Sequence, residues 1–236
     1  MRFLAIIFAV LPGLAIAQGY IPPLEQCEGL YSVQKRNCSV EHVYRCETER
    51  GTLIRKDRWQ PDRPRWVATS DPEGNTVSTW GAANGFQIEG ILENSDPISS
   101  SRLRDTGTDQ FDQVIALRNP MFKDPLPSRF VGKIVLNGAE LELDGVKFLV
   151  ADVAFTVQVN ALTSTTRGTA YLDAEQLVAI TGAYAREQLG QVSESGGAPA
   201  QVIHPGEPGY LVDQGRFDCG ALSDAGPHLF ETERAG

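Results

Sequence analysis

The amino-acid sequence predicts a mainly β protein, an antiparallel meander of about ten short strands that forms a sandwich or a half-barrel with minimal helix. Two observations predict this fold class. Short segments alternate apolar and polar residues, and turn-forming residues recur roughly every eight to twelve positions. The chain has no internal repeat and no inter-domain linker, so we expect residues 18–220 to form a single β-rich domain.

The N-terminus has the three parts of a secretory signal peptide. Arg2 precedes an apolar run over residues 3–11, and the small residues Ala15 and Ala17 suit a signal peptidase. The run is too short to span a bilayer. We therefore expect residues 1–17 to be removed and the chain to be exported to the periplasm or the extracellular space. No cysteine directly follows Ala17, which argues against a lipid anchor.

The charge of the chain restricts its partners. With 21 Lys and Arg against 30 Asp and Glu, the net charge is −9, which argues against unaided binding of nucleic acid. The most apolar later stretch, residues 148–159, is interrupted by Asp152, Thr156 and Gln158. We therefore expect no stable membrane span after signal cleavage, and a soluble protein.

All four cysteines follow the signal peptide, and an even number in an exported chain predicts two disulfides. Their spacing lacks the close pairs of zinc sites, so we expect no metal and no other cofactor. Of the three possible pairings we favour Cys27–Cys38, which would close an irregular arm, and Cys46–Cys219, which would tie an early strand to the C-terminal end. The other two pairings remain open.

The first elements follow an irregular arm over residues 18–37. Residues 40–48 alternate apolar and polar side chains, which predicts a half-buried strand, and residues 52–56 can pair back onto it. Residues 65–69 and 76–80 form a second pair, because the sequence between them is rich in turn formers.

One helical turn is expected in the middle of the chain. It covers residues 97–103, with Asp96 as N-cap and Pro97 at the first helical position. A strand over residues 86–92 precedes it. A polar loop from Asp105 follows and leads into a strand over residues 111–118.

The next segments carry the strongest turn signals. Strands over residues 130–136, 139–143 and from 146 onward are separated by Asn137-Gly138 and Asp144-Gly145, dipeptides that suit two-residue hairpin turns. In the third strand the alternation slips near Ala151-Asp152, which indicates a bulge or a bend. This meander has one apolar face that could curve around a hydrophobic ligand such as a lipid.

Two interpretations remain for the following segment. Residues 167–172 and 176–184 can form another strand pair, or residues 173–189 can form a helix, which Gly182 disfavours. Residues 191–199 are expected to be a loop.

The C-terminal part is expected to contain one more pair of strands. These lie near Val202 and over residues 210–217, and residues 221–236 are expected to form a flexible tail.

The most unusual local composition lies between Arg55 and Trp66, where five cationic residues accompany two of the three tryptophans. Aromatic faces flanked by guanidinium groups suit sugar rings or anionic head groups. The alternative is a hairpin whose arginines stack on its own tryptophans, and we favour it because no second basic segment supports a site. The candidate ligand-binding residues are Arg58, Trp59, Arg63, Arg65 and Trp66.

Other clusters are weaker candidates. Asp105, Asp109 and Asp112 could bind calcium, but they lack the spacing of an EF-hand, and we interpret them as solvated turn residues. The hydroxyl run over residues 163–166 is expected to be a polar loop, although hydroxyl groups could line a pocket.

Three classes of function remain. The sequence best fits an exported, non-enzymatic binding module for a lipid-like or other small ligand. A cell-envelope structural or protein-interaction module is the first alternative, and an unrecognised hydrolase is the second. The hydrolase would need His42, His204 or His228 to meet a carboxylate and a hydroxyl in one cleft, and no nucleophile motif surrounds them. The ligand and any envelope partner are unknown.

Overall fold

The computed structural model describes residues 25–49, 51–61, 63–81, 87–118 and 122–220, and the side chains of all of these except 63 and 64. The expected signal peptide, residues 1–17, and the expected tail, residues 221–236, lie outside the described residues. Within the described part, thirteen strands and one helix are present. The prediction of a mainly β antiparallel protein with minimal helix is confirmed.

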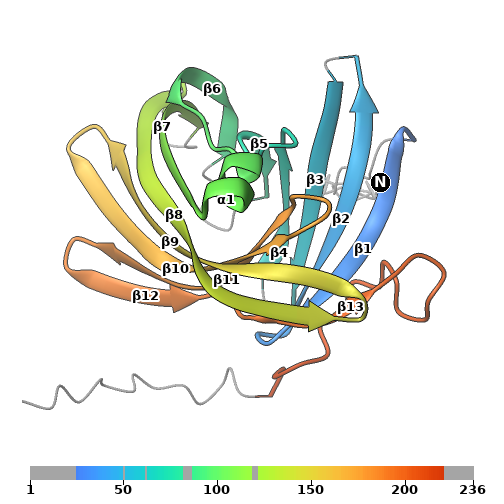
Figure 1. Cartoon of the computed structure of the whole chain (residues 1–236). Helices are drawn as coiled ribbons and strands as arrows, with labels where there is room; N and C mark the ends of the chain where they lie inside the picture. The colour runs from blue at the N-terminus through green and yellow to red at the C-terminus, as the bar shows by residue number, and fades with distance from the viewer. Residues whose placement is uncertain (1–24, 50, 62, 82–86, 119–121, 221–236) are drawn as a thin grey trace, which may run out of the picture.

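The N-terminal strands and the last strand form a six-stranded antiparallel sheet. Figure 1 shows the N-terminal strands of this sheet in blue to teal and its last strand in orange, facing the second sheet. Its strands, in spatial order, are β13 (Pro199–Ile203), β1 (Cys27–Lys35), β2 (Ser39–Thr48), β3 (Gly51–Gln60), β4 (Arg63–Ser70) and β5 (Thr76–Trp80).

The middle of the chain forms a seven-stranded antiparallel sheet that curves strongly (Figure 1). The helix α1 (Ser100–Thr106) lies between its first two strands in the chain. The strands, in spatial order, are β12 (Gln191–Ser195), β11 (Ala179–Gln188), β10 (Leu162–Asp173), β9 (Val146–Val159), β8 (Leu126–Leu143), β7 (Thr108–Arg118) and β6 (Gln87–Asp96).

The helix begins later than predicted. Its N-cap is Ser99, whose hydroxyl accepts a hydrogen bond from the backbone N–H of Arg102 at 3.1 Å. Asp96 is not the cap, because it is the last residue of β6 and pairs with Asp112 of β7. Gly107 ends the helix with a φ of 77°, a conformation that glycine adopts without strain.

The turn predicted at Asn137-Gly138 is wrong. β8 continues through these residues, and its register against β9 shifts between Leu136 and Glu140. The extra residues form a bulge, which the φ of 83° at Gly138 permits. The bulge lies opposite Val150, next to Ala151, so the irregularity predicted near Ala151-Asp152 is close in position but lies in the neighbouring strand. The turn predicted at Asp144-Gly145 is confirmed.

Other segments near the C-terminus differ from the expectations. The strand pair β10–β11 is confirmed, so the alternative helix over residues 173–189 is wrong. β12 is a strand where a loop was expected, because it pairs back onto β11. Residues 210–217 do not form a strand, and only Phe217 makes an isolated β-bridge, with Arg36.

Both predicted disulfides are wrong. Cys27 pairs with Cys46 and Cys38 pairs with Cys219. Residues 27–35 form the strand β1 rather than an irregular arm, and its register places Cys27 directly opposite Cys46 on β2, with a Cα–Cα distance of 4.0 Å. Cys38 lies in the β1–β2 turn and is therefore free to reach the C-terminal segment.

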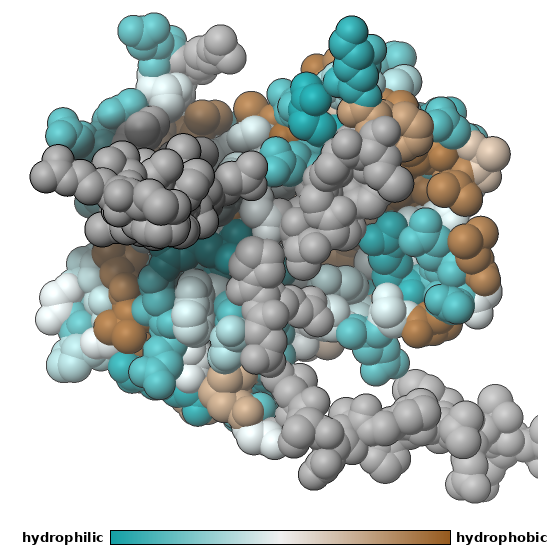
Figure 2. All heavy atoms as spheres, turned by 180° about the vertical axis from the view of Figure 1, so that it is seen from behind, coloured by the Kyte–Doolittle hydropathy of each residue, from teal (hydrophilic) through white to brown (hydrophobic). Residues whose placement is uncertain are grey.

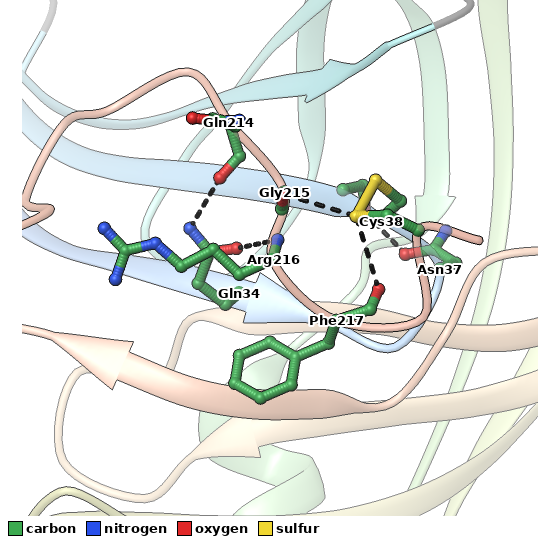
Figure 3. The surroundings of a disulfide bond; sticks show 9 residues. Gln34, Asn37, Cys38, Gln214, Gly215, Arg216 and Phe217 are labelled. Atoms are coloured by element: carbon green, nitrogen blue, oxygen red, sulfur yellow. Dashed lines mark hydrogen bonds between the residues drawn. A yellow bond between two sulfur atoms is a disulfide. The ribbon is translucent and has the colours of Figure 1, made fainter.

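Residues 204–219, which we call the C-terminal strap, cross the outer face of the six-stranded sheet. The side chain of Gln34 donates to the carbonyl of Gln214 and accepts from the backbone N–H of Arg216, each at 3.1 Å (Figure 3). The Cys38–Cys219 disulfide closes the strap at its end. The strap explains why β2 is buried on both faces, rather than half-buried as predicted.

The apolar core lies between the sheets and includes the β8–β9 hairpin that ends at the Asp144-Gly145 turn. Its apolar side chains come from both sheets and from the segment before β11, and they exclude solvent almost completely. They are Tyr31, Val33, Val43, Ile54, Phe148, Val178, Ile180 and Val202. No helix among the described residues has the length and apolar character needed to cross a membrane.

Candidate ligand-binding cavity

A cavity of about 910 Å³ lies between the sheets, beyond the packed core. Its volume is near the upper end of the range of about 300–1,000 Å³ found for small-molecule sites. Strands β7 to β11 of the curved sheet form most of its surface, and β3 and β4 of the other sheet contribute Arg58 and Trp66. Residues of both sheets would therefore contact one occupant.

One wall of the cavity is apolar. Alternation along β9 directs Val153, Phe155, Val157 and Val159 to the same face. All four are only partly buried, so the other sheet does not cover them. The ring of Phe155 lies 6.2 Å from that of Phe130 on β8, measured between centroids. This wall resembles a core surface without its packing partner.

Gly132 makes the arrangement of this wall possible. A Cβ atom at this position would lie 2.4 Å from the ring of Phe111 and 2.5 Å from the Cβ atom of Phe155. Both distances are shorter than van der Waals contact, so any side chain here would displace the aromatic rings. The glycine on β8 therefore allows Phe111 and Phe155 to approach each other across the strand, with ring centroids 6.5 Å apart.

The adjoining part of the same sheet, on β10 and β11, is polar. Ser164 and Thr166 project from β10, and Tyr184, Arg186 and Gln188 project from β11. Within the described part of the chain, none of these five side chains has a hydrogen-bond partner from its own polar atoms. Unpaired polar groups facing a cavity require water or a ligand as partner. The cavity therefore has an apolar side and a polar side.

Arg58 and Trp66 cover the cavity from the six-stranded sheet. The guanidinium carbon of Arg58 lies 5.0 Å from the ring centroid of Trp66, within range of a cation–π contact. Arg58 also donates from Nε to Oε2 of Glu41 at 2.9 Å, and its Nη2 lies 2.8 Å from the same oxygen. Arg58 is thus held between an aromatic ring and a buried carboxylate.

Two lysines complete a buried charged cluster around Glu41. Lys35 Nζ lies 3.8 Å from Glu41 Oε2 and donates to the carbonyl of Thr181 at 2.6 Å. Lys56 Nζ donates to the carbonyl of Ala179 at 2.8 Å. Both lysines therefore join the six-stranded sheet to the backbone of β11. Each of these contacts satisfies a charge that burial would otherwise penalise.

The cluster changes the protonation of its members. Burial alone would raise the pKa of Glu41, but the cations Arg58, Lys35 and Lys56 outweigh it and hold the pKa at about 2. Burial, together with the charge of Arg58, lowers the pKa of Lys35 to about 7. Glu41 is therefore ionised at neutral pH and forms an ion pair with Arg58.

Comparison of the chain with protein-family models, with curated proteins and with solved structures finds no match.

The five site residues predicted from the sequence separate onto two faces of the six-stranded sheet. Arg58 and Trp66 are register partners and both line the cavity. Trp59 and Arg65 are their neighbours along the strands, so they point to the opposite face. There Arg65 forms an ion pair with Asp213 of the strap. The side chain of Arg63 lies outside the described residues.

Sequence reasoning found the apolar wall and missed most of the polar one. The alternation from Val153 to Val159 was the signal for the former. Residues 163–166, interpreted as a loop, belong to β10, and two of their hydroxyls line the cavity. Tyr184 and Arg186 carried no signal, because their shared face becomes apparent only once β11 is known to be a strand.

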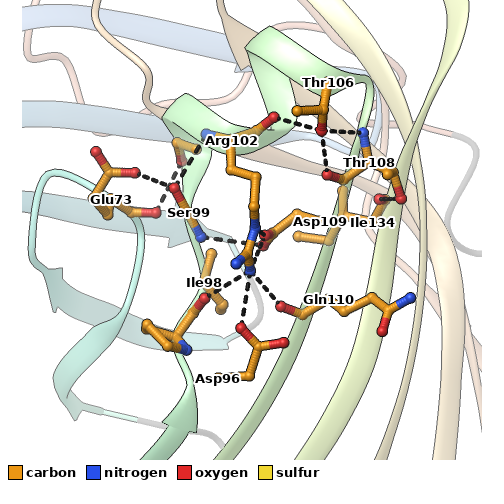
Figure 4. Close-up of polar contacts among 12 residues, drawn as sticks. Glu73, Asp96, Ile98, Ser99, Arg102, Thr106, Thr108, Asp109, Gln110 and Ile134 are labelled. Carbon is orange, nitrogen blue, oxygen red and sulfur yellow. Dashed lines mark hydrogen bonds and ion pairs between the residues drawn. The ribbon is translucent and has the colours of Figure 1, made fainter.

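The acidic cluster predicted from the sequence does not form a common cation site. Asp105 pairs with Arg104 at 2.7 Å, and Asp112 accepts from Arg129 at 2.8 Å. Asp109 is buried, contrary to the expectation of a solvated turn, because it lies in β7 and accepts from Arg102 Nε at 2.6 Å (Figure 4). Among the described residues, no group of three or more His, Cys, Asp or Glu could hold a metal ion.

One histidine meets a hydroxyl and a carboxylate. His42 Nδ1 lies 2.8 Å from Ser32 Oγ, and its Nε2 lies 3.1 Å from Asp213 Oδ1. Ser32 is fully buried beneath the strap, where its Oγ accepts from the backbone N–H of Leu211 at 3.1 Å. Neither Ser32 nor His42 lines the cavity. These contacts attach the strap to the sheet.

The other two histidines offer no comparable group of residues. The ring of His204 hydrogen-bonds the carbonyl of Asp144 through Nε2 at 2.8 Å, and its backbone N–H donates to Glu207. It therefore supports the turn at the end of the core. His228 lies outside the described residues.

Proposed function

We propose that the protein is a non-enzymatic binding module that holds a small hydrophobic ligand between its two sheets. The observation that carries this proposal is the uncovered apolar wall on β8 and β9, which faces a cavity of about 910 Å³. Apolar surface in water costs roughly 25 cal/mol per Å² relative to burial. An apolar occupant would recover that free energy.

The contrast within the same pair of strands supports the proposal. Phe148, in the packed half of β9, is completely buried, whereas Phe155, in the other half, is only partly buried. Phe148 packs in the apolar core, whereas Phe155 lines the cavity. The packed half of β9 stabilises the fold, and the other half leaves a cavity of the kind that binds small molecules.

The exposed residues at the strand ends suit an entrance for such a ligand. Phe122, before β8, and Leu162, at the start of β10, line the cavity although 46% and 48% of their surface is exposed. Both lie at the same end of the curved sheet, where β8 begins and β9 ends. Figure 2 shows hydrophobic residues (brown) gathered mainly on the side of the curved sheet.

We also propose that this function is carried out outside the cytoplasm. Two disulfides, with no free cysteine among the described residues, are typical of oxidising compartments. The signal-peptide pattern of residues 1–17 supports the same compartment. A carrier of apolar molecules has a use there, because such molecules dissolve poorly in the aqueous space.

A cavity-filling substitution tests the proposal. The full-length mature protein is titrated with N-phenyl-1-naphthylamine, an uncharged probe whose fluorescence rises in apolar surroundings. Val157→Trp would fill the cavity and should abolish the fluorescence rise. Gln158→Trp adds the same side chain to the neighbouring, exposed position on the outer face and should leave binding unchanged.

Two results would overturn the proposal. The first is a folded wild-type protein that binds no uncharged apolar probe, as an envelope interaction module would behave. The second is a Val157→Trp variant that folds and binds the probe as well as wild type does. Mass spectrometry of organic extracts of the purified protein would in addition identify any apolar molecule that copurifies.

A further inference from the structure

The charges around the cavity have one sign. Two arginines, Arg58 and Arg186, line it, and no aspartate or glutamate is among the described residues that line it. This is unusual in a chain with a net charge of −9. An apolar cavity needs no charge to hold a hydrocarbon, so the cations call for an explanation of their own.

Arg58 is neutralised by the protein itself. Glu41, which is completely buried, accepts from Arg58 Nε at 2.9 Å and lies 2.8 Å from Nη2. The remaining face of the guanidinium group lies near the ring of Trp66. Arg58 therefore already has a carboxylate partner within the protein.

Arg186 has no such partner. Within the described part of the chain its guanidinium group makes no ion pair and no hydrogen bond, although the side chain is partly buried. Its register partners on the two neighbouring strands are Thr166 and Ser193, which are neutral. A partly desolvated cation without a counterion is unfavourable, and an anion in the cavity would remove that penalty.

The register places this cation beside the apolar wall. Arg186 pairs with Thr166, and Thr166 pairs in turn with Phe155. The three residues thus form one row across the inner face of β11, β10 and β9. With strands about 4.8 Å apart, the backbone of Arg186 lies roughly 10 Å from that of Phe155. A molecule with adjacent polar and apolar parts fits this row.

We propose that the ligand is an anionic amphiphile, which gives the proposed binding function its ligand class and rests on it. The hydrocarbon chain lies against Val153, Phe155 and Val157. A single acidic group, carboxylate or phosphate, accepts two hydrogen bonds from the guanidinium fork of Arg186. The hydroxyl groups of Thr166 and Tyr184 supply further donors beside it.

An uncharged ligand explains less of the site. Filling the cavity with a neutral hydrocarbon would exclude water from Arg186 and leave its charge without any partner. It would also leave the hydroxyls of Ser164 and Thr166 unpaired. An acidic head group satisfies these donors while its chain covers the apolar wall.

Matched ligands test this inference. Palmitate, hexadecyl phosphate and hexadecanol have the same chain length and differ in their head groups, and each can displace N-phenyl-1-naphthylamine from the mature protein. Wild type should bind at least one of the two acids more tightly than the alcohol, by on the order of 10- to 100-fold. The acid with the larger preference identifies the head group. Increasing ionic strength should weaken binding of that acid more than binding of hexadecanol.

Two arginine variants complete the test. Arg186→Gln should reduce the affinity for the acid to that for the alcohol and leave hexadecanol binding unchanged. Arg167→Gln removes the same charge from the exposed face of the adjacent strand and should behave as wild type. Arg186→Lys keeps the charge without the fork and should retain part of the preference.

Different outcomes would overturn the ligand class and the binding function on which it rests. Equal affinities of wild type for acids and alcohol, or an acid preference that survives Arg186→Gln, would overturn the anionic amphiphile and leave the binding function intact. Failure of folded wild type to bind the uncharged probe would overturn both. If Arg186→Gln does not fold, the affinities of wild type and of Arg186→Lys for the acids and for hexadecanol still test the ligand class.

Discussion

His42 and Asp213 are joined by a hydrogen bond of 3.1 Å although 171 residues separate them in the chain. A carboxylate only accepts, so Nε2 of neutral His42 carries the proton and Nδ1 accepts from the hydroxyl of Ser32. Ser32 in turn accepts from the backbone N–H of Leu211. This chain of hydrogen bonds begins and ends on the C-terminal strap and passes through two strands of the sheet.

The disulfide at the end of the strap should contribute more stability than the other one. Cys38 and Cys219 are 181 residues apart in sequence, whereas Cys27 and Cys46 are 19 apart. In the chain-entropy model these cross-links contribute about 5 and about 3 kcal/mol. Urea denaturation of the two double Cys→Ser variants should rank them in this order. The opposite ranking would show that the strap is not closed in the native protein.

Acid should weaken the folded state through His42. Burial lowers the pKa of His42 from 6.5 to about 4, so the unfolded chain binds a proton at pH values where the folded protein does not. The free energy of unfolding should therefore fall as the pH decreases from about 6.5 to about 4, by about 3 kcal/mol in total, and this contribution should then level off.

The variant His42→Gln isolates this effect. The pKa of Glu41 is lowered to about 2, so its own contribution is lost only below about pH 4.5. Urea denaturation at pH 7 and pH 5 should show a smaller difference for the variant than for wild type. An unchanged difference would assign the acid sensitivity to other groups.

The buried charges around Glu41 should be essential to stability. Glu41→Gln would leave Arg58, Lys35 and Lys56 buried without an anion, which typically costs about 3–5 kcal/mol. Glu140→Gln is the matched control, because the pair between Glu140 and Lys147 is exposed and contributes at most about 1 kcal/mol. Thermal and urea unfolding of both variants would measure the difference. Similar small losses would mean that water reaches the cluster.

Asp109 should behave as a structural residue and not as a calcium ligand. Its Oδ1 accepts from Arg102 Nε and its Oδ2 from the backbone N–H of Ser99 at 3.1 Å. Asp109→Asn should lower the free energy of unfolding by about 1.5–3 kcal/mol, the scale of hydrogen bonds to a charged group. Calcium should leave the melting temperature of wild type unchanged. A calcium-dependent increase would contradict this assignment.

The local sequence pattern predicted where strands lie better than it predicted which residues of neighbouring strands pair with each other. The strand over residues 40–48 and the Asp144-Gly145 turn depend on neighbours in the chain, and both were predicted correctly, although the strand is buried on both faces. The disulfides depend on the register between β1 and β2, which no local pattern specifies. The sequence 137–138 has the composition of a turn, yet pairing of β8 with β9 on both sides makes it a bulge.

The candidate site was predictable only in part for the same reason. Arg58 and Trp66 were found because they are close in sequence and unusual in composition. Trp59 and Arg65 were included with them, although alternation along β3 and β4 directs them to the strap side. Arg186 is an ordinary arginine in an amphipathic segment, and its role depends on the absence of an acidic partner among the described residues, which only the assembled fold reveals.

The two phenylalanines of β9 provide a direct test of the open cavity. Phe148 is completely buried in the core, so Phe148→Ala should lower the free energy of unfolding by about 3–5 kcal/mol. Phe155 faces the cavity and its described ring contacts are those with Phe111 and Phe130, so Phe155→Ala should cost only about 1–2 kcal/mol. Binding of N-phenyl-1-naphthylamine should show the reverse order, with the larger loss for Phe155→Ala, because Phe148 does not line the cavity. Urea denaturation and probe titration of the same two preparations would measure both effects. Equal losses of stability would mean that the two sheets close over β9 in solution and that no cavity is available to a ligand.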